Sequence, residues 1–318
     1  MRNNTAVKKI CLVFKTHLDL GYTALAEEIL TRYREKLIPT SLDVAEELRK
    51  RGGAERFSWT MGSWIIHDCL TNGPAALRAR MEEGIRAGDL HWLGVPFTTH
   101  TELMDESLFQ FGLSISQGLD ARFGRTTIAA KMTDVPGHTR SMLPHLAQAG
   151  IRFLHIGCNP GCTHPDVPDI FRWRSPDASE ILVIYHKKEY GEITVPPGLD
   201  VGIAFAHTSD NVGPQSAEAI LEIYEKLRAQ YPNAVIEAGS LDAFAEALLP
   251  YAERFPLITQ ELGDTWIHGP GSAPRRLAQY RALSRLRKEW IAAGRFDDER
   301  PDHYAFSPYC AIWHEGQD

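Results

Sequence analysis

Close to the start of the chain, residues 10–22 read ICLVFKTHLDLGY. The five apolar residues from Ile10 to Phe14 are typical of a strand that is buried on both faces. The segment then turns polar and places His17 and Asp19 two residues apart. Because alternate side chains of a strand share one face, these two side chains are expected to point the same way. The segment therefore predicts a buried strand that presents an imidazole and a carboxylate together at its end.

The rest of the chain repeats the pattern of a short apolar run followed by an amphipathic stretch. We expect further strands at residues 57–60, 91–97, 127–132, 153–156, 181–185, 202–206 and 234–238, with an irregular segment at 157–180. Alternating helices and buried, β-branched strands favour a parallel sheet. Seven or eight such units predict an α/β fold, a parallel β/α barrel. A doubly wound open sheet is the alternative, but no Gly-x-Gly-x-x-Gly turn follows the first strand.

Composition narrows the possible partners. The 318 residues carry a net charge of −7, and the basic residues are scattered, which argues against binding to nucleic acid. The first apolar run is too short for a signal peptide, and no later run is as long as a membrane span. We therefore expect a cytoplasmic protein with no membrane partner. No linker divides the chain, so we expect one barrel domain at residues 1–296 and an irregular tail at 297–318.

A second polar motif follows the strand expected at 127–132. Residues 131–139 read KMTDVPGHT, so that Asp134 leaves a buried strand just before a Pro-Gly turn. In a β/α barrel the carboxyl ends of the strands line the active site. An imidazole and carboxylates gathered there would suit Zn²⁺ or another divalent metal. The alternatives are a structural hydrogen bond between His17 and Asp19, and a simple turn role for Asp134.

Together the two motifs resemble the α-mannosidases of glycoside hydrolase family 38. That family has His-x-Asp-x-Gly-aromatic after its first strand and Asp-x-x-Gly-His-Ser/Thr after a later one. Residues 143–151, LPHLAQAGI, and residues 106–108, ESL, are also similar to the family's pattern. The resemblance extends over residues 8–280 and is closest to a poorly characterised bacterial branch. It implies a metal-dependent retaining glycoside hydrolase, α-mannosidase-like, with a carbohydrate substrate.

The resemblance also implies roles for single residues. His17 and Asp19 would be metal ligands, and Asp134 would be both a metal ligand and the nucleophile that forms a covalent glycosyl intermediate. Tyr22 stands where the family has a tryptophan that stacks on the sugar ring. Pro136 replaces a phenylalanine of the family, which alters an apolar wall of the sugar pocket.

A retaining glycosidase needs a second carboxyl group, about 5–5.5 Å from the nucleophile, as its acid and base. By resemblance this is Asp264, within residues 261–269, ELGDTWIHG. A turn residue is the alternative interpretation of Asp264. Trp266 and His268 would line the substrate pocket, and His268 could instead bind the metal.

The set of metal ligands implied by the resemblance is incomplete in this chain. The family takes a second histidine from a segment beyond its barrel, and we expect a truncated member. Two other functions therefore stay open: an inactive or truncated sugar-binding barrel, and a metal-dependent carbohydrate deacetylase. The deacetylase would need an Asp-Asp pair and a His-x-x-x-His pair. The sequence has no His-x-x-x-His, and its one Asp-Asp pair, Asp297-Asp298, lies in the expected tail.

Overall fold

The computed structural model describes residues 4–20, 22–187, 190–267 and 271–295. Within these ranges the strands are β1 (Lys9–Thr16), β2 (Trp59–Gly62), β3 (Leu90–Leu93), β4 (Ala129–Thr133), β5 (Phe153–Gly157), β6 (Ile170–Arg174), β7 (Glu180–His186), β8 (Val201–Thr208), β9 (Val235–Ala238) and β10 (Leu257–Ile258). The expected tail at 297–318 and the pocket residue His268 lie outside the described residues.

The α-helices are α1 (Ala26–Arg32), α2 (Ile38–Arg51), α3 (Ser63–Asn72), α4 (Ala75–Ala87), α5 (Glu106–Phe123), α6 (Leu143–Gln148), α7 (Ala217–Gln230), α8 (Leu241–Leu248) and α10 (Pro274–Ala292). A π-helical turn, η1 (Tyr33–Leu37), joins α1 to α2, and 3-10 turns occupy η2 (Arg140–Met142), η3 (Leu249–Arg254) and η4 (Thr265–Ile267). No helix of the described ranges combines the length and the apolar character that crossing a bilayer requires.

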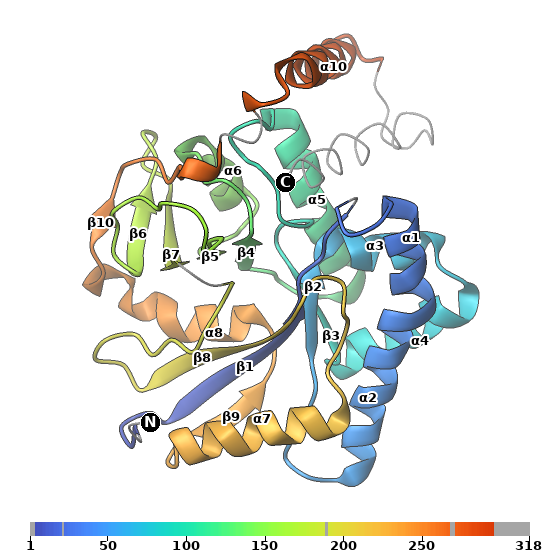
Figure 1. Ribbon diagram of the computed structural model, residues 1–318, viewed down its shortest axis with the longest axis vertical. Helices are drawn as coiled ribbons and strands as arrows, with labels where there is room; N and C mark the ends of the chain where they lie inside the picture. Colours follow the sequence, from blue (N-terminus) through green and yellow to red (C-terminus); the bar gives the residue numbers. More distant parts are fainter. Residues whose placement is uncertain (1–3, 21, 188–189, 268–270, 296–318) are drawn as a thin grey trace.

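The strands form two five-stranded sheets (Figure 1). In the first sheet, β1 pairs with β8 along its whole length on one edge, while β9 and β2 share the other edge. The order in this sheet is β3-β2-β1-β8, and in the second it is β10-β6-β7-β5-β4. All of these pairings are parallel except β6 with β7. The α/β class and the parallel strands are as the sequence predicts.

The prediction of a closed barrel of seven or eight strands is confirmed only in part. On one side, the sheets approach where the Gly94 amide donates to the Ala129 carbonyl at 2.9 Å. On the other side, β8 pairs with no strand of the second sheet among the described residues and forms only an isolated bridge, between Thr194 and Ile203. The antiparallel strand β6 follows β7 in the second sheet, where a barrel would continue with parallel strands. The sheets therefore form a parallel-stranded half-barrel.

Both faces of β1 are buried, which explains its unbroken apolar run. The even-numbered residues from Ile10 to Phe14 pack outward against the helices, and Cys11 and Val13 pack inward between the sheets. Helix α8 fills the amino-terminal end of this inner space. Because side chains alternate along the strand, the inward series continues to Lys15 and ends at His17. The carboxyl end of the half-barrel therefore receives polar groups.

Two element predictions need correction. Residues 157–180, expected to be irregular, contain β6, in which Phe171 and Trp173 alternate toward the core and are fully buried. The strand expected at 91–97 ends at Leu93, and Pro96 could not continue its ladder.

Asp242, at the start of α8, joins that helix to β4. Its Oδ1 accepts hydrogen bonds from the Ile128 and Ala129 amides at 2.8 and 2.9 Å. Burial raises the pKa of Asp242 from 3.8 to about 6. The folded state therefore holds this proton more tightly than the unfolded state, and stability is lost as the pH rises from about 4 to about 6.

We expect Asp242→Asn to remove this pH dependence, because an amide oxygen can accept the same bonds without a charge. The variant should gain stability over the native chain by up to about 3 kcal/mol at pH 7, and little or nothing below pH 4. Urea unfolding at both pH values measures the difference. An equal effect of the substitution at the two pH values would contradict the explanation.

Candidate active site

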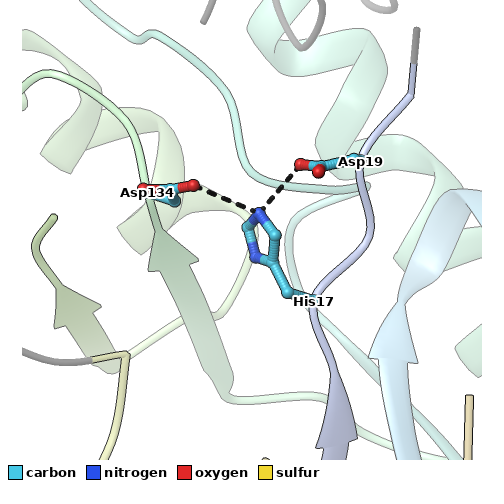
Figure 2. A group of neighbouring side chains, drawn as sticks. All are labelled: His17, Asp19 and Asp134. Atoms are coloured by element: carbon cyan, nitrogen blue, oxygen red, sulfur yellow. Dashed lines mark ion pairs between the residues drawn. The ribbon is translucent and has the colours of Figure 1, made fainter. Parts of the chain in front are cut away.

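His17, Asp19 and Asp134 meet at the carboxyl end of the half-barrel. His17 Nε2 lies 3.1 Å from Asp19 Oδ1 and 3.6 Å from Asp134 Oδ2, and the three side chains point toward one another (Figure 2). One potential ligand atom from each residue lies within 4.8 Å of the others. His17 is only 2% exposed, whereas the two carboxylates are partly open. The structure thus brings together the three residues that the sequence predicts as metal ligands.

The backbone at Asp134 makes a tight turn. Asp134 has φ 60°, the left-handed conformation, which a residue other than glycine adopts at a cost of roughly 1–3 kcal/mol. Its amide donates to the Gly157 carbonyl at the end of β5. Gly137, with φ 65°, closes the turn, and a Cβ there would come within 2.5 Å of Gly263 Cα. The Pro-Gly sequence therefore allows the turn after β4 to pack tightly against residues 262–264.

Two donors fix the other oxygen of Asp134. Asn159 Nδ2 donates to Oδ1 at 2.9 Å, and the Tyr190 hydroxyl donates to the same oxygen. The Tyr190 ring also stacks on His17, with centroids 5.4 Å apart. Burial and the bond to Asp134 raise the pKa of Tyr190, so its hydroxyl stays protonated as a donor. Oδ1 is thus engaged by the protein, and Oδ2 is turned to His17.

The loop after β8 supports the other half of the cluster. The backbone amide of Asn211 donates to the His17 carbonyl at 2.9 Å. The side-chain Nδ2 of Asn211 donates to the Asp19 carbonyl at 2.9 Å. Its Oδ1 accepts from the Asp19 amide at 3.3 Å. Asn211 has φ 53°, which asparagine tolerates better than most residues. Asn211 therefore holds the His17–Asp19 segment against the end of β8.

Asp210, in the same loop, adds a further carboxyl group near the cluster. Its pKa is raised, first by loss of hydration, and the charges of Asp19 and Asp134 raise it further while His17 opposes them. The next residue, Asn211, bonds to the His17 carbonyl, so Asp210 lies beside the segment that carries His17 and Asp19. Because β8 pairs with β1 up to Thr16 and Thr208, the residues after the two strands meet. Asp210 was not predicted, although its position just beyond an expected strand is a signal for it.

Asn159 and Tyr190 were not predicted either. Both follow strands of the second sheet, β5 and β7, at the same carboxyl edge as Asp134. Asn159 lies in a Cys-Asn-Pro-Gly-Cys segment, and Tyr190 in a loop without a recognisable motif. Their positions just after two strands are the only feature of the sequence that marks them as site residues. That feature is shared by the residues next to them in the chain.

The other predicted site residues do not join the cluster of ligand atoms among the described residues. Asp264 is 7% exposed; its Oδ1 accepts from the Trp266 amide at 2.7 Å, and its Oδ2 is buried without a partner in the described chain. Trp266 is half-buried, and Tyr22 is 70% exposed. The loop that carries Asp264 packs on the turn after Asp134, where the backbones of Leu262 and His138 exchange two hydrogen bonds.

Comparison with solved structures finds the same fold in glycoside hydrolases. An α-mannosidase from Enterococcus faecalis V583 superposes with a TM-score of 0.63 at 15% identity, over 80% of this chain and 31% of that one. A protein of glycosyl hydrolase family 38 from Enterococcus faecalis gives 0.54 at 13% identity, over 81% and 29%. A 4-α-glucanotransferase from Thermococcus litoralis gives 0.52 at 12% identity, over 91% and 47%.

These likenesses show the fold, and the chain spans less than a third of the length of the two Enterococcus faecalis proteins. No family model matches the sequence, and no curated protein is detectably similar to it.

Proposed function

Because the chain shares the fold of family 38 glycoside hydrolases, we propose that it is a metal-dependent retaining glycosidase that acts on α-mannosides. The observation that carries the proposal is the convergence of His17, Asp19 and Asp134 at the carboxyl ends of β1 and β4. The α-mannosidase among the solved structures suggests the sugar. The proposed substrate is therefore a carbohydrate with a terminal α-mannosyl group.

The three residues fit a divalent metal. Ligands about 2.0–2.1 Å from a tetrahedral Zn²⁺ lie roughly 3.3 Å from one another, and here His17 Nε2 lies 3.1 and 3.6 Å from the two carboxylate oxygens. Imidazole nitrogen and carboxylate oxygen are both ligands that Zn²⁺ takes in proteins. A bound Zn²⁺ would supply Lewis-acid charge for holding sugar hydroxyl groups.

Asp134 is the proposed nucleophile. One of its carboxylate oxygens attacks the anomeric carbon, the bond from that carbon to the leaving oxygen breaks, and a glycosyl ester of Asp134 forms. The donors Asn159 and Tyr190 stabilise the ionised carboxylate and orient it. Water then hydrolyses the ester and regenerates the carboxylate with retention of the anomeric configuration.

The leaving oxygen needs a proton, and two carboxyl groups are candidates to supply it. Asp264 is the candidate by resemblance to the family. Asp210 is favoured by its interactions with the cluster and by its raised pKa, which keeps a carboxyl protonated to a higher pH. We therefore propose Asp210 as the acid and base, with Asp264 as the alternative.

The test is hydrolysis of an aryl α-mannoside by the purified chain. We expect activity that chelation removes and Zn²⁺ restores, together with about one bound Zn²⁺ per chain by calorimetry. His17→Ala should lose both. Asp43→Asn, an exposed carboxylate paired with Arg80 on the outer helices, is the control and should lose neither.

Two results would replace this proposal. A folded chain that binds mannosides without cleaving them would favour the inactive sugar-binding barrel. Release of acetate from acetylated sugars, without glycoside cleavage, would favour the deacetylase.

A further inference from the structure

A lysine is buried between the two sheets, below the proposed metal site. Lys131 lies on β4, three residues before Asp134, and is 2% exposed. Its Nζ atom lies 4.9 Å from the centre of the Phe205 ring on β8. Burial lowers the pKa of Lys131 well below that of a free lysine. A buried lysine costs folding free energy unless its donors are used, so its hydrogen bonds are informative.

Lys131 has two acceptors. Its Nζ lies 3.2 Å from His155 Nδ1 on β5, and it donates to the carbonyl oxygen of Tyr190. The buried nitrogen thus has one hydrogen-bond partner on β5 and another in the loop after β7. The lysine therefore ties the backbone of Tyr190, whose hydroxyl binds Asp134, to the same strand that carries Asp134.

The hydrogen bonds continue from His155 across the second sheet. His155 Nε2 lies 3.0 Å from His186 Nδ1, and His186 Nε2 lies 2.7 Å from Thr194 Oγ1. Because Lys131 donates to Nδ1 of His155, the neutral ring carries its proton on Nε2 and donates onward. His186, accepting at Nδ1, likewise donates from Nε2 to Thr194. Burial lowers the pKa of His155 well below its usual value, which keeps this ring neutral.

The far end of the chain of bonds is anchored to the first sheet. The backbone amides of Thr194 and Ile203 each donate to the other's carbonyl at 2.9 Å. The segment that starts at Tyr190 and ends at Thr194 is thus held at both ends, by Lys131 at one and by His186 and β8 at the other.

We propose that Lys131, His155 and His186 are positioning residues, which hold the Tyr190 segment so that the tyrosine hydroxyl stays on Asp134 Oδ1 and its ring on His17. The roles of Asp134 in catalysis and in metal binding rest on the proposed function. The hydrogen bonds that hold the Tyr190 segment belong to the fold of the chain and need no bound metal. Lys131 thereby helps to orient the Asp134 carboxylate toward His17 through Tyr190, without a hydrogen bond of its own to either residue.

The test follows the Tyr190 side chain directly, in protein labelled with 3-fluorotyrosine. The chain has ten tyrosines, and Tyr190→Phe identifies the fluorine resonance of Tyr190 by its loss. In Lys131→Met, a substitution that suits an apolar interior, we expect this resonance to shift toward that of a solvent-exposed tyrosine. Thr194→Val, at the far end of the chain of bonds, should shift it in the same direction by less.

The matched control is Lys226→Met, the same change at an exposed position on α7, and it should leave the Tyr190 resonance in place. An unmoved resonance in both Lys131→Met and Thr194→Val would overturn the proposal. If Lys131→Met does not fold, Thr194→Val decides alone: a shift supports the tether, and no shift rejects it.

Zn²⁺ affinity is a second measurement. It should not change on substitution of Lys131 if this lysine only stabilises the fold. Loss of a group that orients a metal ligand typically weakens binding about 10–100-fold. We expect Tyr190→Phe and Lys131→Met each to weaken Zn²⁺ binding by about 10-fold, and the double variant to be no weaker than either. Additive losses would mean that Lys131 acts independently of Tyr190, against the proposal. If the native chain binds no Zn²⁺, the proposed function fails, while the fluorine resonance still decides the tether.

Discussion

Replacement of Asp134 by asparagine is expected to abolish hydrolysis of aryl α-mannosides, with a loss of at least about 10⁴-fold in kcat/KM, as when other covalent nucleophiles are removed. The amide is a poor nucleophile and a poor metal ligand. Asparagine tolerates the left-handed conformation found at this position, and its oxygen can still accept from Asn159 and Tyr190. The fold should therefore survive, with an unchanged thermal midpoint, and Asp43→Asn is the control for a lost surface carboxylate.

A second variant tests the role of Asp134 as the nucleophile directly. Glycine adopts φ 60° readily, so Asp134→Gly should fold and leave space where the carboxylate stood. Azide is then expected to attack the anomeric carbon from the vacated side as the aryl group leaves, giving a glycosyl azide of inverted configuration. Nuclear magnetic resonance of the product identifies the anomer. Full activity of Asp134→Asn on the aryl α-mannoside would reject Asp134 as the nucleophile.

The central cluster could be predicted from the sequence because each of its residues stands just beyond a buried strand. The apolar run of β1 is recognisable locally, and period-two alternation puts His17 on the inner face. Asp134 is marked by the Pro-Gly turn that follows it. Neither pattern indicates that the ends of the two strands lie close together in the fold. The resemblance to a known family supplies that inference.

The supporting residues could not be predicted in the same way. Tyr190 reaches Asp134 because Lys131 and His186 hold its loop, and these contacts join strands that lie far apart in the sequence. The incomplete closure of the barrel has a similar origin. It depends on the path of residues 157–180, where the alternation of Phe171 and Trp173 that forms β6 is too short to stand out. Pairing between distant segments, rather than local pattern, decides both features.

The acid and base can be assigned by the dependence of each variant on the leaving group. An acid is needed most when the leaving oxygen is a poor leaving group, and general acid catalysis contributes about 10²–10⁴-fold. We expect Asp210→Asn to lose activity in this range on a methyl α-mannoside and much less on the dinitrophenyl α-mannoside, which needs no protonation. Azide should restore turnover of the dinitrophenyl substrate and give a product of retained configuration, because it replaces water in attack on the glycosyl ester.

Asp264→Asn serves as the paired variant, because it makes the same change of carboxylate to amide in the loop that packs on the turn after Asp134. Its oxygen can still accept from the Trp266 amide, so we expect a folded protein with similar losses on both substrates. If the dependence on the leaving group appears instead in Asp264→Asn and is missing in Asp210→Asn, Asp264 is the acid, as the resemblance to the family implies. If neither variant shows it, both assignments are wrong, and the proton comes from a group outside these two loops.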